Sequence, residues 1–86
     1  MNYGAALELL DEGKQIQRQG WNGKGMFIFL VLEYEWSLFV FGWEKKWLND
    51  NFEPLSFICM KTADDKLVPW LASQTDMLAD DWQVCE

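Results

Sequence analysis

The hexapeptide Gly20–Gly25, with the sequence GWNGKG, combines residue types that hold nucleotides. Glycines let backbone N–H groups approach a phosphate closely, and Lys24 adds a positive charge. Trp21 provides an aromatic face on which a base can stack. The spacing is not that of a P-loop, because Gly25 stands where a Mg²⁺-binding Ser or Thr would follow the lysine. The alternative is a plain hairpin turn at Asn22-Gly23 with a packed tryptophan.

A second group of polar residues follows Pro69-Trp70. Ser73 is typical of a helix N-cap, and Asp76, three residues later, completes a capping box. The free N–H groups at such a helix end attract anions and polar ligands. Gln74, Thr75 and Asp76 supply an amide, a hydroxyl and a carboxylate, and Asp76 is the candidate to bind ribose hydroxyls. The alternative is a cap that satisfies only its own helix.

Catalytic and metal-binding chemistry has little support in the sequence. The chain has no histidine, which removes the most common general base and neutral metal ligand. Cys59 and Cys85 have no CxxC spacing and are too few for a zinc site, so we expect two buried, reduced thiols in a cytosolic protein. Neither Asp64-Asp65 nor Asp80-Asp81 is followed by the ligand spacing of a calcium loop. We therefore expect a binding protein and not an enzyme, with no cofactor and no metal.

The composition indicates a single domain, residues 1–86, in which half of the residues are hydrophobic. Its apolar runs are too short to span a membrane, and its acidic, amphipathic N-terminus is unlike a signal peptide, so we expect a cytoplasmic protein. The net charge of −7 argues against DNA or RNA as a partner. Six tryptophans are difficult to bury in so small a core, so we expect some of them at a subunit interface or in a ligand site.

The residue pattern predicts an α+β fold, with an N-terminal helix packed on a small twisted antiparallel β-sheet and a short helix near the C-terminus. Asn2 and Gly13 are suited to begin and end the first helix, whose apolar face is expected at Tyr3, Leu7 and Leu10. Strands are predicted at residues 14–19, 26–32, 36–41, 57–61, 66–68 and 82–84, with a helical turn at 43–47 and a short helix after residue 73.

The strand at Met26–Leu32 is apolar at every position, so both of its faces must be covered. One helix covers one face of a small sheet. The other face requires a second layer, from this chain or from a neighbouring subunit, and we therefore expect an oligomer. Trp43 and Trp47 lie four residues apart and are interpreted as interface or core residues.

Two blocks of the sequence, one near each end, carry a resemblance. The first is Met1–Met26, which ends in the glycine-rich hexapeptide. The second is Met60–Trp82, which contains Pro69-Trp70 and the capped helix. Together they resemble a family of small phage and prophage proteins, the Thoeris anti-defence proteins of the second type. The segment Leu32–Cys59, rich in Trp and Phe, departs from the family pattern.

The resemblance implies sequestration without catalysis, in the cytoplasm of an infected bacterium. Family members bind 1″–3′ glycocyclic ADP-ribose, a cyclic ADP-ribose isomer that the TIR enzyme of Thoeris defence makes as a signal, and so keep the effector inactive. They look like homotetramers with pockets between protomers, and some also bind cyclic dinucleotides of CBASS defence at a different site. The candidate ligand-binding residues are Trp21, Asn22, Gly23, Lys24, Met26, Lys61, Trp70, Gln74, Thr75 and Asp76.

Within this set, Trp21 is expected to stack on the base, Lys24 and the turn N–H groups to bind phosphate, and Asp76 to bind ribose. If the pockets lie between protomers, the two blocks can come from different chains. For Lys61, the alternative to ligand binding is a solvated residue at the end of a strand.

The alternative function is that of an acidic phage protein that inhibits a host protein directly, as a DNA mimic or an interaction inhibitor. The net charge of −7 favours it. The scattered acidic residues and the hydrophobic half of the composition argue against it. An enzyme that degrades the signal is disfavoured, because no nucleophile has a histidine to activate it.

Overall fold

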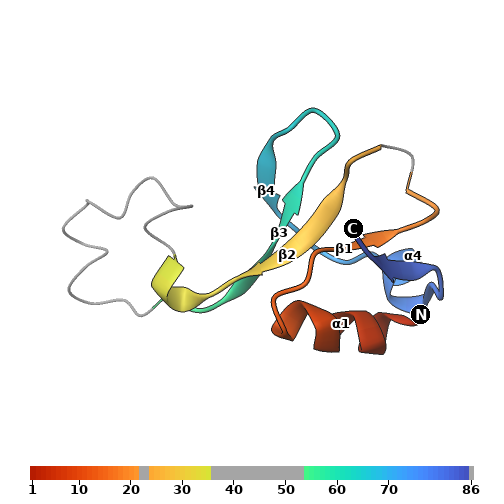
Figure 1. Cartoon of the computed structure of the whole chain (residues 1–86), viewed down its shortest axis with the longest axis horizontal. Coiled ribbons are helices and arrows are strands. Elements are labelled where there is room, and N and C mark those ends of the chain that lie inside the picture. Colours follow the sequence, from red (N-terminus) through yellow and green to blue (C-terminus); the bar gives the residue numbers. More distant parts are fainter. Residues whose placement is uncertain (22–23, 36–53, 86) are drawn as a thin grey trace.

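The computed structural model describes residues 1–21, 24–35 and 54–85. It confirms the predicted α+β fold, with a helix, an antiparallel sheet and a short second helix (Figure 1). The predicted strand at 36–41, the helical turn at 43–47 and the turn residues Asn22-Gly23 lie outside the described residues. The elements are α1 (Tyr3–Asp11), β1 (Ile16–Arg18), β2 (Phe27–Val31), the 3₁₀ turn η1 (Glu33–Glu35), β3 (Phe57–Lys61), β4 (Leu67–Pro69), α4 (Gln74–Leu78) and β5 (Trp82–Val84).

The five strands form one sheet in the order β4-β3-β2-β1-β5, and all neighbours are antiparallel. The C-terminal strand therefore lies beside β1, with Gln17 opposite Gln83 and Arg18 opposite Trp82. Met1 and Trp82 exchange hydrogen bonds, from the Met1 ammonium to the Trp82 carbonyl at 2.9 Å and from the Trp82 N–H to the Met1 carbonyl at 3.1 Å. The first and last segments of the chain are thus joined.

Helix α1 begins and ends as its sequence predicts. The Asn2 side chain accepts a hydrogen bond from the Ala5 N–H at 2.9 Å, and Gly13 adopts a left-handed φ of 90° just beyond the C-cap. The helix packs against β1, β2, β5 and α4. No helix among the described residues is long and apolar enough to span a membrane.

The expected apolar face of α1 is wrong in one residue. Leu7 is 39% exposed, whereas Ala6 and Leu10 are buried and Tyr3 is half-buried. Successive helical residues are rotated by about 100°, so the contact stripe is centred between Ala6 and Leu10 and leaves Leu7 at its rim. The small side chain of Ala6 lets the helix approach the sheet closely. The core cluster consists of Ala6, Leu10, Ile16, Ile28, Met60 and Trp82.

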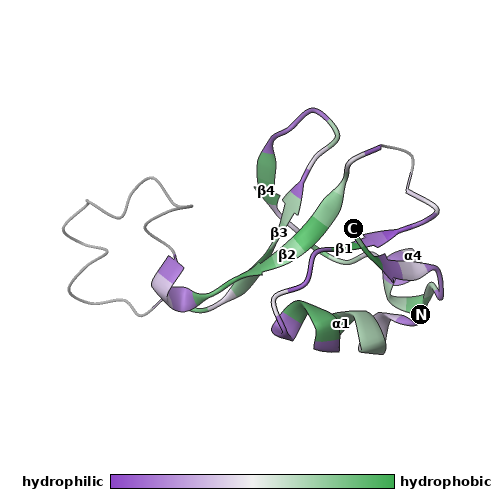
Figure 2. Ribbon diagram, viewed as in Figure 1, coloured by the Kyte–Doolittle hydropathy of each residue, from purple (hydrophilic) through white to green (hydrophobic). Residues whose placement is uncertain are grey.

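The sheet face away from α1 is divided into an apolar half and a polar half. Ile28 faces α1, so strand alternation places Phe27, Phe29 and Val31 on the opposite face, with Cys59 opposite Phe29. Figure 2 shows the hydrophobic run along β2 and β4. Over β1 and β5 the same face presents Gln17 and Gln83. The polar half lies next to the segment that contains the predicted nucleotide-binding residues.

The hairpin between β3 and β4 turns at the predicted residues, and its second strand begins one residue later than expected. Asp65 occupies a left-handed position with φ of 62°, where a glycine is common in such turns. Its carboxylate pairs with Lys61 at 2.8 Å. Both cysteines are free thiols, and Cys59 is buried in β3 as expected, whereas Cys85 is only half-buried.

We predict that Gly13→Ala lowers the free energy of unfolding by roughly 1–2 kcal/mol, because a Cβ at positive φ crowds the following carbonyl. Urea denaturation followed by circular dichroism would measure it. Gly4→Ala is the matched control, since Gly4 is a helical residue whose added Cβ meets only Asn2 Oδ1, at 3.6 Å. This change should be neutral or raise stability by up to about 1 kcal/mol. A Gly13→Ala variant as stable as the wild type would contradict the assigned helix end.

Candidate functional site

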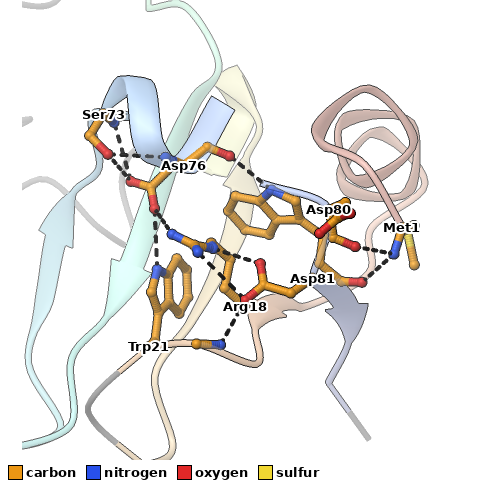
Figure 3. Close-up of polar contacts among 9 residues, drawn as sticks. Met1, Arg18, Trp21, Ser73, Asp76, Asp80 and Asp81 are labelled. Atoms are coloured by element: carbon orange, nitrogen blue, oxygen red, sulfur yellow. Dashed lines mark hydrogen bonds and ion pairs between the residues drawn. The ribbon is translucent and has the colours of Figure 1, made fainter. Parts of the chain in front are cut away.

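The guanidinium of Arg18 joins β1 to two neighbouring segments near the other end of the described chain, 58 and 63 residues away (Figure 3). Its Nη1 donates to Asp76 Oδ1 at 2.9 Å, and its Nε donates to Asp81 Oδ1 at 2.8 Å. The second oxygen of Asp81 accepts the Gly20 N–H at 2.8 Å. The three charged side chains are only 14–26% exposed. Strand β1, helix α4 and the segment before β5 are therefore held in one arrangement at the start of the glycine-rich hexapeptide.

Asp76 lies at the centre of this polar network. Its Oδ1 accepts from Arg18 and, at 3.4 Å, from the indole Nε1 of Trp21. Its Oδ2 accepts from the N–H and the hydroxyl of Ser73, and the Asp76 N–H returns a bond to the Ser73 hydroxyl, so the predicted capping box is confirmed. A carboxylate offers about four lone-pair positions. Four donors already use those of Asp76, so its predicted contact with ribose would require the loss of one of them.

The network shifts the pKa values of its members. Burial acts to raise the pKa of Asp76, but the hydrogen bonds from Arg18, Ser73 and Trp21 outweigh it, and the pKa is lowered. The hydrogen bond from Arg18 lowers the pKa of Asp81. The bonds to Asp81 and then Asp76 raise the pKa of Arg18 further. Both carboxylates are consequently ionised near neutral pH, and together they more than balance the charge of Arg18.

Four aromatic rings pack beside the network and bring the two sequence blocks into contact within one chain. The ring centroids of Trp21 and Trp82 lie 5.4 Å apart in an edge-to-face arrangement, and those of Trp21 and Trp70 lie 6.4 Å apart. Trp70 and Trp82 are 6.0 Å apart, and Tyr3 contacts both of them. The Trp82 Nε1 donates to the Asp76 carbonyl at 3.0 Å. Trp70 is thus a supporting residue behind Trp21.

Trp21 also lines a shallow hollow of about 290 Å³. Its lining is mostly polar and consists of Gln17, Arg18, Gln19, Trp21, Lys24, Gly25 and Gln83. Lys24 is exposed and forms no ion pair with another described residue. Because Arg18 is neutralised by two carboxylates, Lys24 supplies the uncompensated positive charge of this lining. The hollow is therefore suited to an anionic ligand with an aromatic part.

The structure places the predicted site residues in three different surroundings. Trp21 and Lys24 line the hollow, while Trp70 and Asp76 lie behind it, and Met26 packs against the core. Lys61 donates to the Gly25 carbonyl at 2.9 Å and pairs with Asp65, so it supports the segment without lining the hollow. Gln74 and Thr75 are exposed on α4, outside the hollow. Asn22 and Gly23 lie outside the described residues.

Sequence reasoning missed Gln17, Gln19 and Gln83 as lining residues. Gln17 and Gln19 alternate with Ile16 and Arg18, and this alternation is the only local signal of an outward-facing row. Gln83 gives no signal by itself, because its place in the hollow depends on the pairing of β5 with β1.

Two comparisons with known proteins cover nearly the whole chain. The family described as the Thoeris anti-defense 2-like domain matches residues 1–85. The protein named Thoeris anti-defense 2 from Bacillus phage SP01 is 46% identical to this chain over 85 residues, which cover 98% of this chain and 93% of that protein. Both matches extend across residues 32–59, the segment between the two motif blocks that departs from the family pattern.

We predict that acid destabilises the fold through the Arg18 network. Carboxylates have a pKa of about 3.9–4.3 in an unfolded chain, and the values of Asp76 and Asp81 are lower in the folded state. Their contribution is therefore complete above that range and is lost as the pH falls from about 4 through the lowered folded-state values. The urea midpoint, measured from pH 7 downward, should decline in that window.

Asp76→Ala should lower the free energy of unfolding at pH 7 by roughly 1.5–3 kcal/mol, because it removes charge-assisted hydrogen bonds to Arg18 and the helix cap. This variant should also show a smaller decline of the urea midpoint at low pH. Asp80→Ala is the control, since the exposed Asp80 contributes only its backbone carbonyl to the contacts in Figure 3, and it should change stability by less than about 0.5 kcal/mol. Identical acid profiles for Asp76→Ala and the wild type would refute the assigned role of this carboxylate.

Proposed function

The chain belongs to the Thoeris anti-defense 2-like family and so has a phage anti-Thoeris role, and we propose that it exerts this role by sequestering 1″–3′ glycocyclic ADP-ribose. The ligand is bound and not altered. Holding the signal away from its effector leaves the defence inactive in the cytoplasm of the infected cell.

The proposal rests on one observation. Trp21 and Lys24 line the same hollow, and Arg18, the other cation of its lining, is already neutralised by two carboxylates. The ligand contains an adenine, two riboses and a pyrophosphate. Trp21, a half-buried lining residue, would provide an aromatic ring for the base, and Lys24 would provide a charge for a phosphate. Lys24 is therefore free to act on the ligand, whereas Arg18 is committed to holding the site together.

The chemistry of the surroundings favours binding over turnover. The carboxylates nearest the hollow, Asp76 and Asp81, are held by Arg18 with lowered pKa values, whereas a general acid or base acts best with a pKa near the working pH. Among the described residues, no group of His, Cys, Asp and Glu is arranged to hold a metal ion. These features support a role in which the ligand is released intact.

The size of the hollow supports pockets completed by a second protomer. Sites for small molecules typically measure about 300–1,000 Å³, and the hollow of about 290 Å³ lies just below this range. It accommodates part of a cyclic ADP-ribose molecule, so the remainder would contact another copy of the chain. We propose a homotetramer, and four leucines that are more than half exposed favour it: Leu55 at 76%, Leu67 at 55%, Leu71 at 91% and Leu78 at 84%.

Calorimetric titration with 1″–3′ glycocyclic ADP-ribose should show tight binding, and the ligand released by heating should be chemically intact.

Lys24→Gln should weaken binding roughly 10-fold, because it removes a charge-assisted hydrogen bond to phosphate. Trp21→Ala should remove stacking worth about 1–3 kcal/mol, and Trp21→Phe should retain part of it. Recovery of degraded ligand would contradict sequestration and would indicate an enzymatic role.

Lys14→Gln is the matched control for Lys24→Gln, because Lys14 is also exposed but lies outside the hollow. Since Trp21 contacts Trp70 and Trp82, its variants need a parallel unfolding measurement to separate lost stacking from lost structure. If the wild type does not bind, CBASS cyclic dinucleotides are the next ligands to titrate. Affinity for a host protein that survives in these variants would favour the direct-inhibitor alternative.

Light scattering at micromolar concentration should give a mass above that of a dimer of 10.1 kDa chains. Leu71→Asp, at the most exposed of the four leucines, is a variant that should lower this mass if the residue lies in a contact between copies. A monomeric wild type would contradict the proposed tetramer, and the hollow would then have to bind its ligand within one chain.

A further inference from the structure

We propose that the carboxamides of Gln17 and Gln83 recognise the hydrogen-bonding edge of the adenine base while the base stacks on Trp21. This inference rests on the proposed function and assigns the base specificity of the same site. No motif in either sequence block pointed to these two residues.

The sheet register places the two glutamines side by side. Ile16 pairs with Val84, Gln17 with Gln83 and Arg18 with Trp82 across the β1–β5 ladder. Ile16 and Trp82 are buried in the core under α1, so alternation turns the two glutamines to the opposite face. Directly opposed residues in an antiparallel pair have Cβ atoms about 4.5–5.5 Å apart.

Both carboxamides remain available for a ligand. Gln17 is half-buried and Gln83 is exposed, and both line the hollow together with Trp21 and Lys24. No hydrogen bond joins either carboxamide to another described residue, so their donors and acceptors can face the hollow without breaking an internal contact.

The chemistry of an amide matches adenine more closely than it matches the rest of the ligand. A carboxamide presents a donor and an acceptor in one plane, and glutamine pairs in this way with the N6 amino group and N7 of adenine. It carries no charge, so it neither repels the pyrophosphate nor competes with Lys24 for it. Two adjacent amides beside an indole therefore provide a polar edge and a stacking face for one base. Ribose hydroxyls are the competing partners, and they do not depend on the identity of the base.

The test compares two probes, 1″–3′ glycocyclic ADP-ribose and its analogue with hypoxanthine in place of adenine. The analogue replaces the 6-amino donor by an oxo acceptor and leaves the riboses and the pyrophosphate unchanged. The wild type should prefer the adenine ligand by roughly 5- to 150-fold, the range for one bidentate amide pair. Gln17→Ala and Gln83→Ala should each reduce that preference toward equality. Gln15→Ala, an exposed position outside the hollow, should retain it.

The outcomes separate this inference from the proposed function. A wild type that binds both probes equally, or glutamine variants that weaken both probes to the same extent, would overturn base recognition while leaving sequestration in place. A wild type that binds neither probe would overturn both. Thermal unfolding of each variant is measured in parallel, and because both glutamines lie outside the core, an unchanged midpoint is expected.

Discussion

The ion pairs of Arg18 with Asp76 and Asp81 hold together the segments from which the candidate site is built. The two partners lie 58 and 63 residues away along the chain, so no local element could fix their positions. Buried ion pairs contribute little net stability when compared with a packed apolar alternative, because both charges lose their hydration. The benefit of this network is geometric. It orients Trp21, closes the cap of α4 and fixes the start of the glycine-rich hexapeptide through Gly20.

The same network also decides which charge is available to a ligand. The chain carries a net charge of −7, and its overall field opposes an anionic ligand. Two carboxylates bind Arg18, so the local positive charge of the hollow comes from the exposed Lys24. The proposed site would depend on short-range contacts, namely stacking, one cation and neutral amides. These contacts act over a few ångströms and control how long a ligand stays bound more than how fast it arrives.

The division of the outer sheet face bears on the proposed assembly. Over β2 the face carries the half-buried Phe27 and Phe29 and the fully buried Val31, whereas over β1 and β5 it carries the glutamine pair. An apolar area next to a small polar hollow suits a site completed by a second copy of the chain. A protein of this size has little interior in which to enclose a ligand, so a shared pocket extends the surface that one chain can offer.

The sequence by itself determined the fold class, the caps of both helices, most strand positions and the two blocks that carry the family resemblance. These features depend on local rules, such as a side chain that accepts the N–H groups of its own helix or an apolar pattern with the period of a strand. It also singled out Trp21 and Lys24. Only the tertiary structure decided that Asp76 is occupied by four donors, that Trp70 supports Trp21 from behind, and that Gln83 reaches the hollow. The capping box accounts for two of these four donors, whereas the bonds from Arg18 and Trp21, the contact of Trp70 with Trp21 and the pairing of Gln83 with Gln17 join residues from distant parts of the chain and leave no local pattern.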